Sequence, residues 1–125
     1  MFVVNNEDLS IYATRGDMGA LEITAEHDGT AYTFRTGDVV RLKVFEKKSC
    51  GDVVLQKDVT VTEDTDIVEM TLTGAETTFG EVISKPVDYW YEIELNPDTM
   101  PQTIVGYDED GAKVFRLYPE GGKGA

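Results

Sequence analysis

The sequence predicts an all-β domain, a sandwich of two sheets built from about eight strands. Apolar and polar residues alternate with a period of two in almost every ordered-looking segment, so successive side chains point to opposite faces of a strand. Turn-forming residues separate these segments at short, even intervals. No stretch of ten residues carries the 3.6-residue period of an amphipathic helix. Short, evenly spaced strands favour a sandwich over an α/β fold, whose parallel strands need helical crossovers.

The first third of the chain contains three expected strands. Residues 10–14 form the first, which ends at a turn made by Gly16 and Asp17. Segments 19–26 and 31–35 form a candidate hairpin, because the Asp-Gly pair between them is a strong hairpin signal.

Three further strands are expected in the middle of the chain. Segments 39–46 and 53–62 are separated by a polar turn that contains a glycine. Segment 66–72 follows after the acidic turn 63–66, and it is expected to pair with 53–62 as another hairpin.

One short stretch, residues 73–80, is expected to be helical for a single turn. Thr73 is a capping residue and Glu76 follows three positions later, as in a capping box. Glycines bracket the stretch, so the turn is expected to carry the chain from one sheet to the other.

The last strands are expected at 87–95, 103–107 and 112–118, the latter two forming a hairpin through an acidic turn that contains a glycine. The sequence therefore predicts a single β-sandwich domain over residues 1–120. A flexible glycine-rich tail is expected at 121–125, because it has nothing to bury.

One face of each strand must be removed from water, so the apolar members of the alternating runs are expected to form the core. In segment 87–95, Tyr89 and Tyr91 share a face with Ile93 and Leu95, which leaves Trp90 beside two glutamates on the outer face. The expected core residues are Leu21, Ile23, Val40, Leu42, Val44, Val59, Val61, Val68, Met70, Leu72, Tyr91, Ile93 and Phe115.

The net charge of −13 limits the classes of partner. An acidic surface repels phosphate backbones and anionic lipids, so neither a nucleic acid nor a membrane is an expected partner. The acidity either keeps a β-rich protein soluble and blunts its strand edges, or it matches a basic surface on a partner protein. The opening residues 1–4 are too short for the apolar core of a secretory signal, so synthesis in the cytoplasm without a signal peptide is expected.

No arrangement of residues is typical of catalysis, so no catalytic, cofactor-binding or metal-ligating residue is predicted and no cofactor is expected. Cys50 is the single cysteine, which excludes an intrachain disulfide, and no general base is identified for it. His27 lies in a turn without an identifiable catalytic partner. The many carboxylates occupy solvent-face positions of strands, which favours solvation over paired acid–base work.

Two short motifs have structural interpretations that are favoured over functional ones. Arg15-Gly16-Asp17 matches the integrin-binding tripeptide, but Gly-Asp also makes a good turn after a short strand. Asp108 to Gly111 resembles the start of a calcium loop, yet the twelfth position is Pro119 where a glutamate is needed. A β-turn is therefore expected there.

Trp90 is the residue most suggestive of binding. Its expected position on the outer face, between carboxylates, suits a ring that anchors a protein interface or stacks on a sugar. A ring covered by a loop of its own chain is an equally open alternative.

The order of segments carries a resemblance to a known family. A Gly-Asp turn precedes a Leu-containing alternating strand, residues 37–45 read Gly-Asp-Val-Val-Arg-Leu-Lys-Val-Phe, and residues 90–95 read Trp-Tyr-Glu-Ile-Glu-Leu. The chain closes with Phe-Arg-Leu-Tyr-Pro-Glu-Gly at 115–121. This pattern resembles the immunoglobulin-like N-terminal domain of phage baseplate upper proteins and similar small prophage tail accessory proteins, over roughly residues 10–121.

The resemblance implies an immunoglobulin-like sandwich and a non-enzymatic structural protein of a phage or prophage tail or baseplate. It implies docking to other tail or baseplate proteins, a place in the virion tail, and a homo-oligomer in the particle. The expected interface residues are Trp90, Tyr107 and Tyr118. The alternative is a carbohydrate-binding module that uses the same exposed aromatic rings as stacking platforms.

Overall fold

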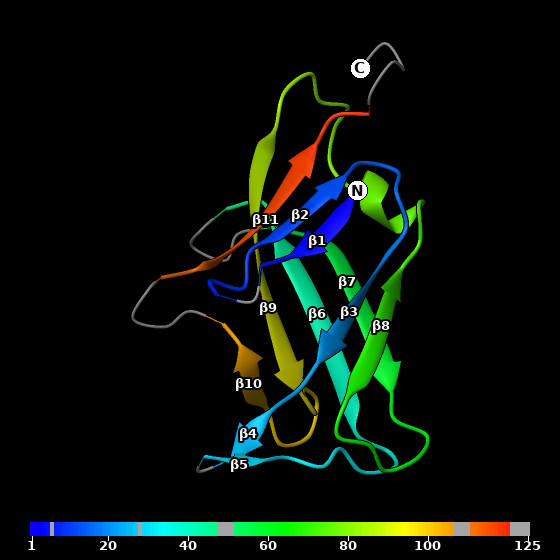
Figure 1. Ribbon diagram of the computed structural model, residues 1–125, viewed down its shortest axis with the longest axis vertical. Coiled ribbons are helices and arrows are strands. Elements are labelled where there is room, and N and C mark those ends of the chain that lie inside the picture. Colours follow the sequence, from blue (N-terminus) through cyan, green and yellow to red (C-terminus); the bar gives the residue numbers. More distant parts are fainter. Residues whose placement is uncertain (6, 28, 48–51, 107–110, 121–125) are drawn as a thin grey trace.

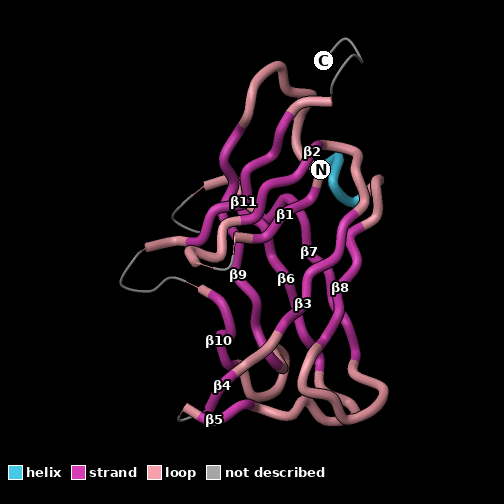
Figure 2. The backbone as a smooth tube through the Cα atoms, in the orientation of Figure 1, coloured by secondary structure: helices cyan, strands magenta, loops and turns pink. Residues whose placement is uncertain are grey.

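A computed structural model describes residues 1–5, 7–27, 29–47, 52–106 and 111–120 of the chain. It shows two β-sheets that face each other, which confirms the predicted all-β sandwich (Figure 1). The described residues form eleven strands, of which three are only two or three residues long. Figure 2 shows that strands dominate both layers and that the helical turn lies near the N-terminus in space.

The larger sheet holds seven strands around a long central one. Antiparallel pairing joins most neighbours, but β2 and β11 run parallel. Across the sheet the order is β1 (Phe2–Val4), β2 (Ile11–Thr14), β11 (Lys113–Tyr118), β9 (Val87–Leu95), β6 (Val39–Phe45) and β7 (Val53–Thr60), with β10 (Gln102–Val105) beside β9 on the same edge as β11.

The second layer is a pair of strands, β3 (Gly19–Ile23) and β8 (Val68–Leu72), in antiparallel register. A small hairpin of β4 (Glu26–His27) and β5 (Thr30–Ala31) continues from β3 at one end of the molecule. Taken in chain order, β3 and β8 stand where strands B and E stand in an immunoglobulin domain. Strands β6, β7, β9 and β11 likewise stand where C, C′, F and G stand.

Two of the three predicted hairpins are wrong in their pairing. β10 and β11 do not pair with each other, because both lie along one edge of β9. β7 pairs with β6 and β8 pairs with β3, so the chain crosses between the sheets after β7 instead of turning back. The hairpin predicted after β3 shrinks to the two residue pairs of β4 and β5. A short connection permits two strands to pair, but it does not require it. Each sheet must bury its apolar face against the other, so consecutive strands can belong to different sheets.

The expected core is confirmed for all but one residue. Val59 is only partly buried, because it lies on β7 at the edge of the larger sheet. The core also includes Ile11, Ala13, Phe34 and Leu117, which are fully buried. At the end near η1 (Glu76–Thr78), an aromatic cluster closes the sandwich: Phe79 lies 5.0 Å from Tyr89 and 5.4 Å from Phe115, ring centroid to centroid, both edge-on.

The predicted capping box is present at the turn between β8 and β9. The amide of Glu76 donates to Thr73 Oγ1 at 3.2 Å, and the amide of Thr73 donates to Glu76 Oε1 at 2.9 Å. The same carboxylate oxygen accepts from Lys57 Nζ at 2.8 Å, which ties the edge strand β7 to the turn. The turn carries the chain from the smaller sheet to the larger one, as predicted.

The opposite end of the sandwich is held by Asp38 and Asn96. Asp38 accepts hydrogen bonds from the Arg35 amide at 2.9 Å, the Tyr32 hydroxyl at 2.8 Å and the Asn96 side-chain amide at 3.2 Å. Burial opposes ionisation of Asp38, but these hydrogen bonds outweigh it and lower its pKa. Asn96 in turn exchanges hydrogen bonds with the backbone of Val39, which aligns the ends of β6 and β9.

Several predictions fall outside the described residues. They concern Cys50, Tyr107, the acidic turn at 108–110 and the tail at 121–125, as well as the side chain of His27.

The register of β9 can be tested by truncating Ile93. Its side chain is 4% exposed in the middle of the core, so Ile93→Ala is expected to lower the free energy of unfolding by about 2–5 kcal/mol through lost burial and a cavity. Chemical denaturation of the two proteins measures the difference. A loss below about 1 kcal/mol would mean that this face of β9 is not the core face.

Candidate functional site

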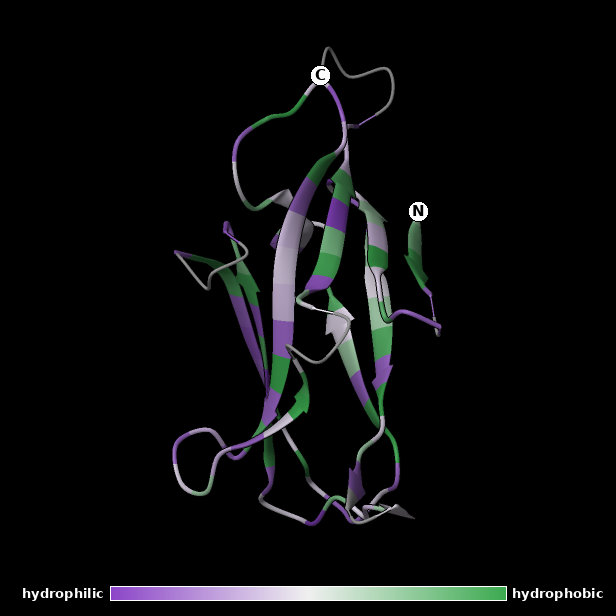
Figure 3. Cartoon of the chain, turned by 90° about the vertical axis from the view of Figure 1, so that its left-hand side faces the viewer, coloured by the Kyte–Doolittle hydropathy of each residue, from purple (hydrophilic) through white to green (hydrophobic). Residues whose placement is uncertain are grey.

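The outer face of the larger sheet carries the side chains most suited to binding. Along β9, Tyr89, Tyr91, Ile93 and Leu95 are buried, whereas Trp90, Glu92 and Glu94 point to the other face and are half-buried. Figure 3 shows the corresponding alternation of hydrophobic and hydrophilic bands along the strands.

Four apolar side chains line up across this face, and we call them the outer apolar row: Val114, Trp90, Phe45 and Val53. They are successive register partners on β11, β9, β6 and β7, so they share one face of the sheet. Phe45 is 6% exposed yet lies outside the main core cluster, and Val53 at the edge is 46% exposed. The row therefore forms an apolar stripe perpendicular to the strands.

Ion pairs flank the outer apolar row on one side. Arg116 pairs with Asp88, its register partner on β9, with 2.6 Å between Nε and Oδ1. Its guanidinium also lies 5.8 Å from the ring centre of Tyr12 on β2.

A second set of ion pairs flanks the row on the other side. Lys43 lies 3.3 Å from Glu94, nitrogen to oxygen. Two residues away on β6, Arg41 pairs with Asp58 at 2.8 Å and with Asp98 at 3.0 Å, nitrogen to oxygen. The Arg41 guanidinium lowers the pKa of Asp58. The charges of these ion pairs are thus matched within the chain.

Glu92 is the least compensated carboxylate of this face. Burial raises its pKa, the neighbouring Glu94 raises it further, and Lys43 only partly opposes the two. Groups with a perturbed pKa are enriched at functional sites, and Glu92 shares its face of β9 with Trp90. The site thus combines an apolar stripe with one destabilised charge.

The structure separates the residues that the sequence grouped as an interface. Trp90 lies on the outer face as predicted, but it is half-buried between Val114 and Phe45 and not fully exposed. Tyr118 lies on the same face of β11, four residues or about 13 Å from Val114 along the strand, with the Arg116 pair between them. Tyr107 lies outside the described residues.

Sequence reasoning missed the partners of Trp90. Phe45 and Val114 each interrupt the alternation of their own strand by placing an apolar residue at a polar position, which was the available signal. Their alignment with Trp90 depends on the register between strands that lie far apart in the sequence.

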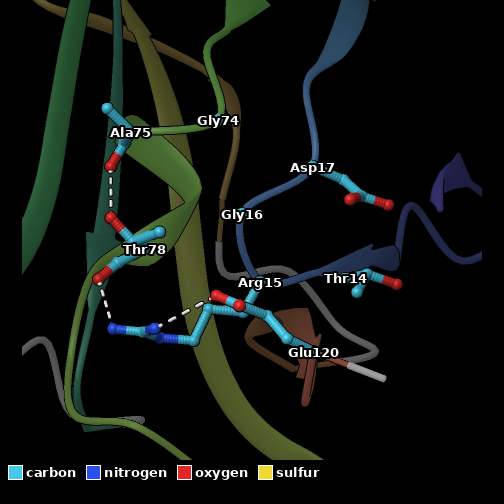
Figure 4. A pocket seen from close by; sticks show the side chains of 8 residues that line it. All are labelled: Thr14, Arg15, Gly16, Asp17, Gly74, Ala75, Thr78 and Glu120. Atoms are coloured by element: carbon cyan, nitrogen blue, oxygen red, sulfur yellow. Dashed lines mark hydrogen bonds and ion pairs between the residues drawn. The ribbon is translucent and has the colours of Figure 1, made fainter. Parts of the chain in front are cut away.

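The Arg15-Gly16-Asp17 tripeptide forms part of a cleft of about 490 Å³ at the end of the sandwich near η1 (Figure 4). Arg15 donates to the carbonyl of Thr78 at 2.9 Å and pairs with Glu120 at 3.4 Å, and its side chain is only 14% exposed. Gly16 has φ +90°, a conformation that favours glycine in a tight turn. The guanidinium is engaged inside the chain, which supports the structural interpretation of this motif.

Among residues 1–5, 7–27, 29–47, 52–106 and 111–120, no group of three or more His, Cys, Asp or Glu side chains is placed to hold a metal ion. Nor does any helix in those ranges have the length and apolarity to span a membrane.

No family model, no curated protein and no solved structure matches the chain.

The raised pKa of Glu92 predicts that replacing this residue by a neutral one changes the stability of the protein in a pH-dependent way. The folded state holds this proton more tightly than the unfolded state, so stability falls as the pH rises from the ordinary glutamate pKa through the raised value. Glu92→Gln is therefore expected to raise the unfolding temperature at pH 7 and to leave it unchanged well below about pH 4.

Thermal unfolding across this pH range measures the effect, with Glu63→Gln in an exposed turn as the matched control. A Glu92→Gln protein that is less stable than the parent at pH 7 would contradict the assigned environment.

Proposed function

We propose that this chain is a non-enzymatic structural protein of a phage or prophage tail or baseplate, located in the virion, that docks to other tail proteins through the outer face of its larger sheet. The observation that carries the docking proposal is the outer apolar row with Trp90 near its centre. The assignment to a tail rests on the resemblance of the sequence to baseplate upper proteins.

The composition of the face is that of a protein interface. Interfaces have an apolar, aromatic centre surrounded by a polar rim, and tryptophan is enriched among the residues that dominate binding energy. Here the apolar row is the centre, and the Arg116–Asp88 and Lys43–Glu94 pairs are the rim. Those charges are already paired within the chain, so a partner that covers the row can leave them in place. Glu92, whose charge is only partly compensated by Lys43, is the carboxylate that such a partner has to accommodate.

The face also lies on a rigid part of the fold. Trp90 is on the central strand β9, which is hydrogen-bonded on both edges, and its backbone position is fixed by β6 and β11. A preorganised anchor loses little conformational entropy on binding, which suits permanent assembly into a particle. Repeated copies in such a particle would present the row with rotational symmetry.

Trp90→Ala is expected to weaken binding to the docking partner about tenfold or more, since tryptophan hot spots contribute at least about 2 kcal/mol. Because the ring is only half-buried, the substitution should lower the free energy of unfolding less than Ile93→Ala does. The partners to test are the proteins encoded by the neighbouring genes, co-expressed and purified. Met100→Ala is the control, because Met100 is 75% exposed in the loop between β9 and β10 and off this face.

The fluorescence of Trp90 reports directly on the same face, because it is the single tryptophan of the chain. A change on adding the tail partner supports docking. A saturable change on adding oligosaccharides would favour the carbohydrate-binding alternative instead. Turnover of a glycan or peptide by the pure protein, abolished by one carboxylate substitution, would overturn the non-enzymatic proposal.

A further inference from the structure

The smaller sheet has an open edge beside β3. Within the part of the chain that the structure describes, β3 is hydrogen-bonded to β8 alone, and β1 contacts it without pairing with it. An immunoglobulin domain places strand A at this position beside strand B. Here β1 and β2, the first strands of the chain, pair in the opposite sheet. The hydrogen-bonding edge of β3 that faces away from β8 is therefore unpaired among the described strands.

A groove of about 730 Å³ lies along this edge. One wall is the segment 20–26, which includes most of β3 and the start of β4. The other wall is formed by side chains of β9 and β10, Tyr91, Ile93, Ile104 and Val105. The seven residues of the first wall span about 23 Å when extended, which is the length of an ordinary strand.

The end of the groove near the N-terminus is closed by β1. The ring of Phe2 lies so close to Gly19 that a Cβ atom there would come within 2.0 Å of Phe2 Cγ. Val4 and Leu9 line the groove just below this contact. The unpaired edge of β3 that borders the groove thus begins after Gly19 and runs toward Glu26, and the groove beside it is lined by both apolar and polar residues.

The solvent side of the same edge is acidic. Glu22, Thr24 and Glu26 are exposed. Glu22 stands directly opposite Glu69 of β8, and like charges in register destabilise a pair of strands. A basic side chain added next to Glu22 would relieve this repulsion.

We propose that the groove takes an extended segment of a partner protein in which aliphatic residues alternate with Lys or Arg, added as a third strand to β3 and β8. The aliphatic side chains fill the groove against Ile93, Ile104 and Val105, and the basic ones face Glu22 and Glu26. A second copy of this chain is a poorer occupant, because its net charge is also −13. The inference specifies a second contact for the proposed docking function and uses a surface distinct from the outer apolar row.

The probe is a synthetic nonapeptide, acetyl-Lys-Val-Lys-Ile-Lys-Val-Lys-Ile-Lys-amide, titrated by fluorescence polarisation with a terminal dye. Two N-methylated versions accompany it, one methylated at every Lys and the other at every aliphatic residue. Amide groups of alternate residues point to the same edge of a strand, so one version is expected to lose binding and the other to keep it. Equal binding of all three peptides would overturn strand addition.

Variants of the protein locate the contact. Ile104→Lys is expected to weaken binding at least about tenfold, whereas Ile67→Lys, the same change at an exposed site outside the groove, leaves it unchanged. The double change Glu22→Lys with Glu26→Lys alters only exposed side chains, so it tests the charge arrangement even if Ile104→Lys fails to fold. The double change should weaken binding of the Lys peptide and strengthen binding of a peptide that has Glu at the Lys positions.

The controls separate this inference from the docking function itself. The Trp90→Ala protein should bind the peptide as the parent does, because Trp90 lies outside the groove. Loss of tail docking in this variant therefore does not count against the groove proposal. Equal weakening by Ile67→Lys and Ile104→Lys, or no reversal by the double charge change, would show non-specific attraction and overturn the groove proposal. Concentration-dependent dimers that Ile104→Lys abolishes, without peptide binding, would identify a second copy as the occupant and likewise overturn it.

Discussion

The structure depends on the pairing of β9 on both of its edges. β6 lies along one edge. On the other edge, β11 pairs with the first part of β9 and β10 pairs with its last residues. This fixes the strict alternation of β9 in space: one face supplies Tyr89, Tyr91, Ile93 and Leu95 to the core, and the other presents Trp90. A shift of one residue would exchange the two faces, so the same register determines both stability and the proposed binding surface.

The free edges differ in their protection. β7 carries Lys57 on the inward side, bonded to Glu76, and a charge at that place discourages pairing with another chain. β1 is only three residues long and offers little to pair with. β3 has neither device on the edge beside the groove; its charges, Glu22 and Glu26, lie on the exposed side and select for a basic partner. This contrast is why strand addition is proposed at β3.

The sequence was most informative where the pattern is local. The limits of β9, the faces of its residues and the capping box of Thr73 and Glu76 follow from alternation and capping alone. Two of the three predicted hairpins were wrong, because the pairing of β3 with β8 and of β6 with β9 involves segments far apart in the chain. The outer apolar row was not predicted, for the same reason: Phe45 and Val114 are visible as exceptions to alternation, but only the register between strands aligns them with Trp90. Val59 is less buried than predicted, because the alternating pattern does not indicate which strand lies at the edge of the sheet.

Hydrogen exchange measured for individual amides tests the central position of β9 most directly. The amides from Tyr89 to Leu95 should exchange only through global unfolding, since neighbours flank this strand on both sides. Alternate amides of β3, on the edge beside the groove, should exchange much faster than those bonded to β8. Exchange of the β9 amides as rapid as that of edge strand β7, or uniform protection along β3, would contradict the account.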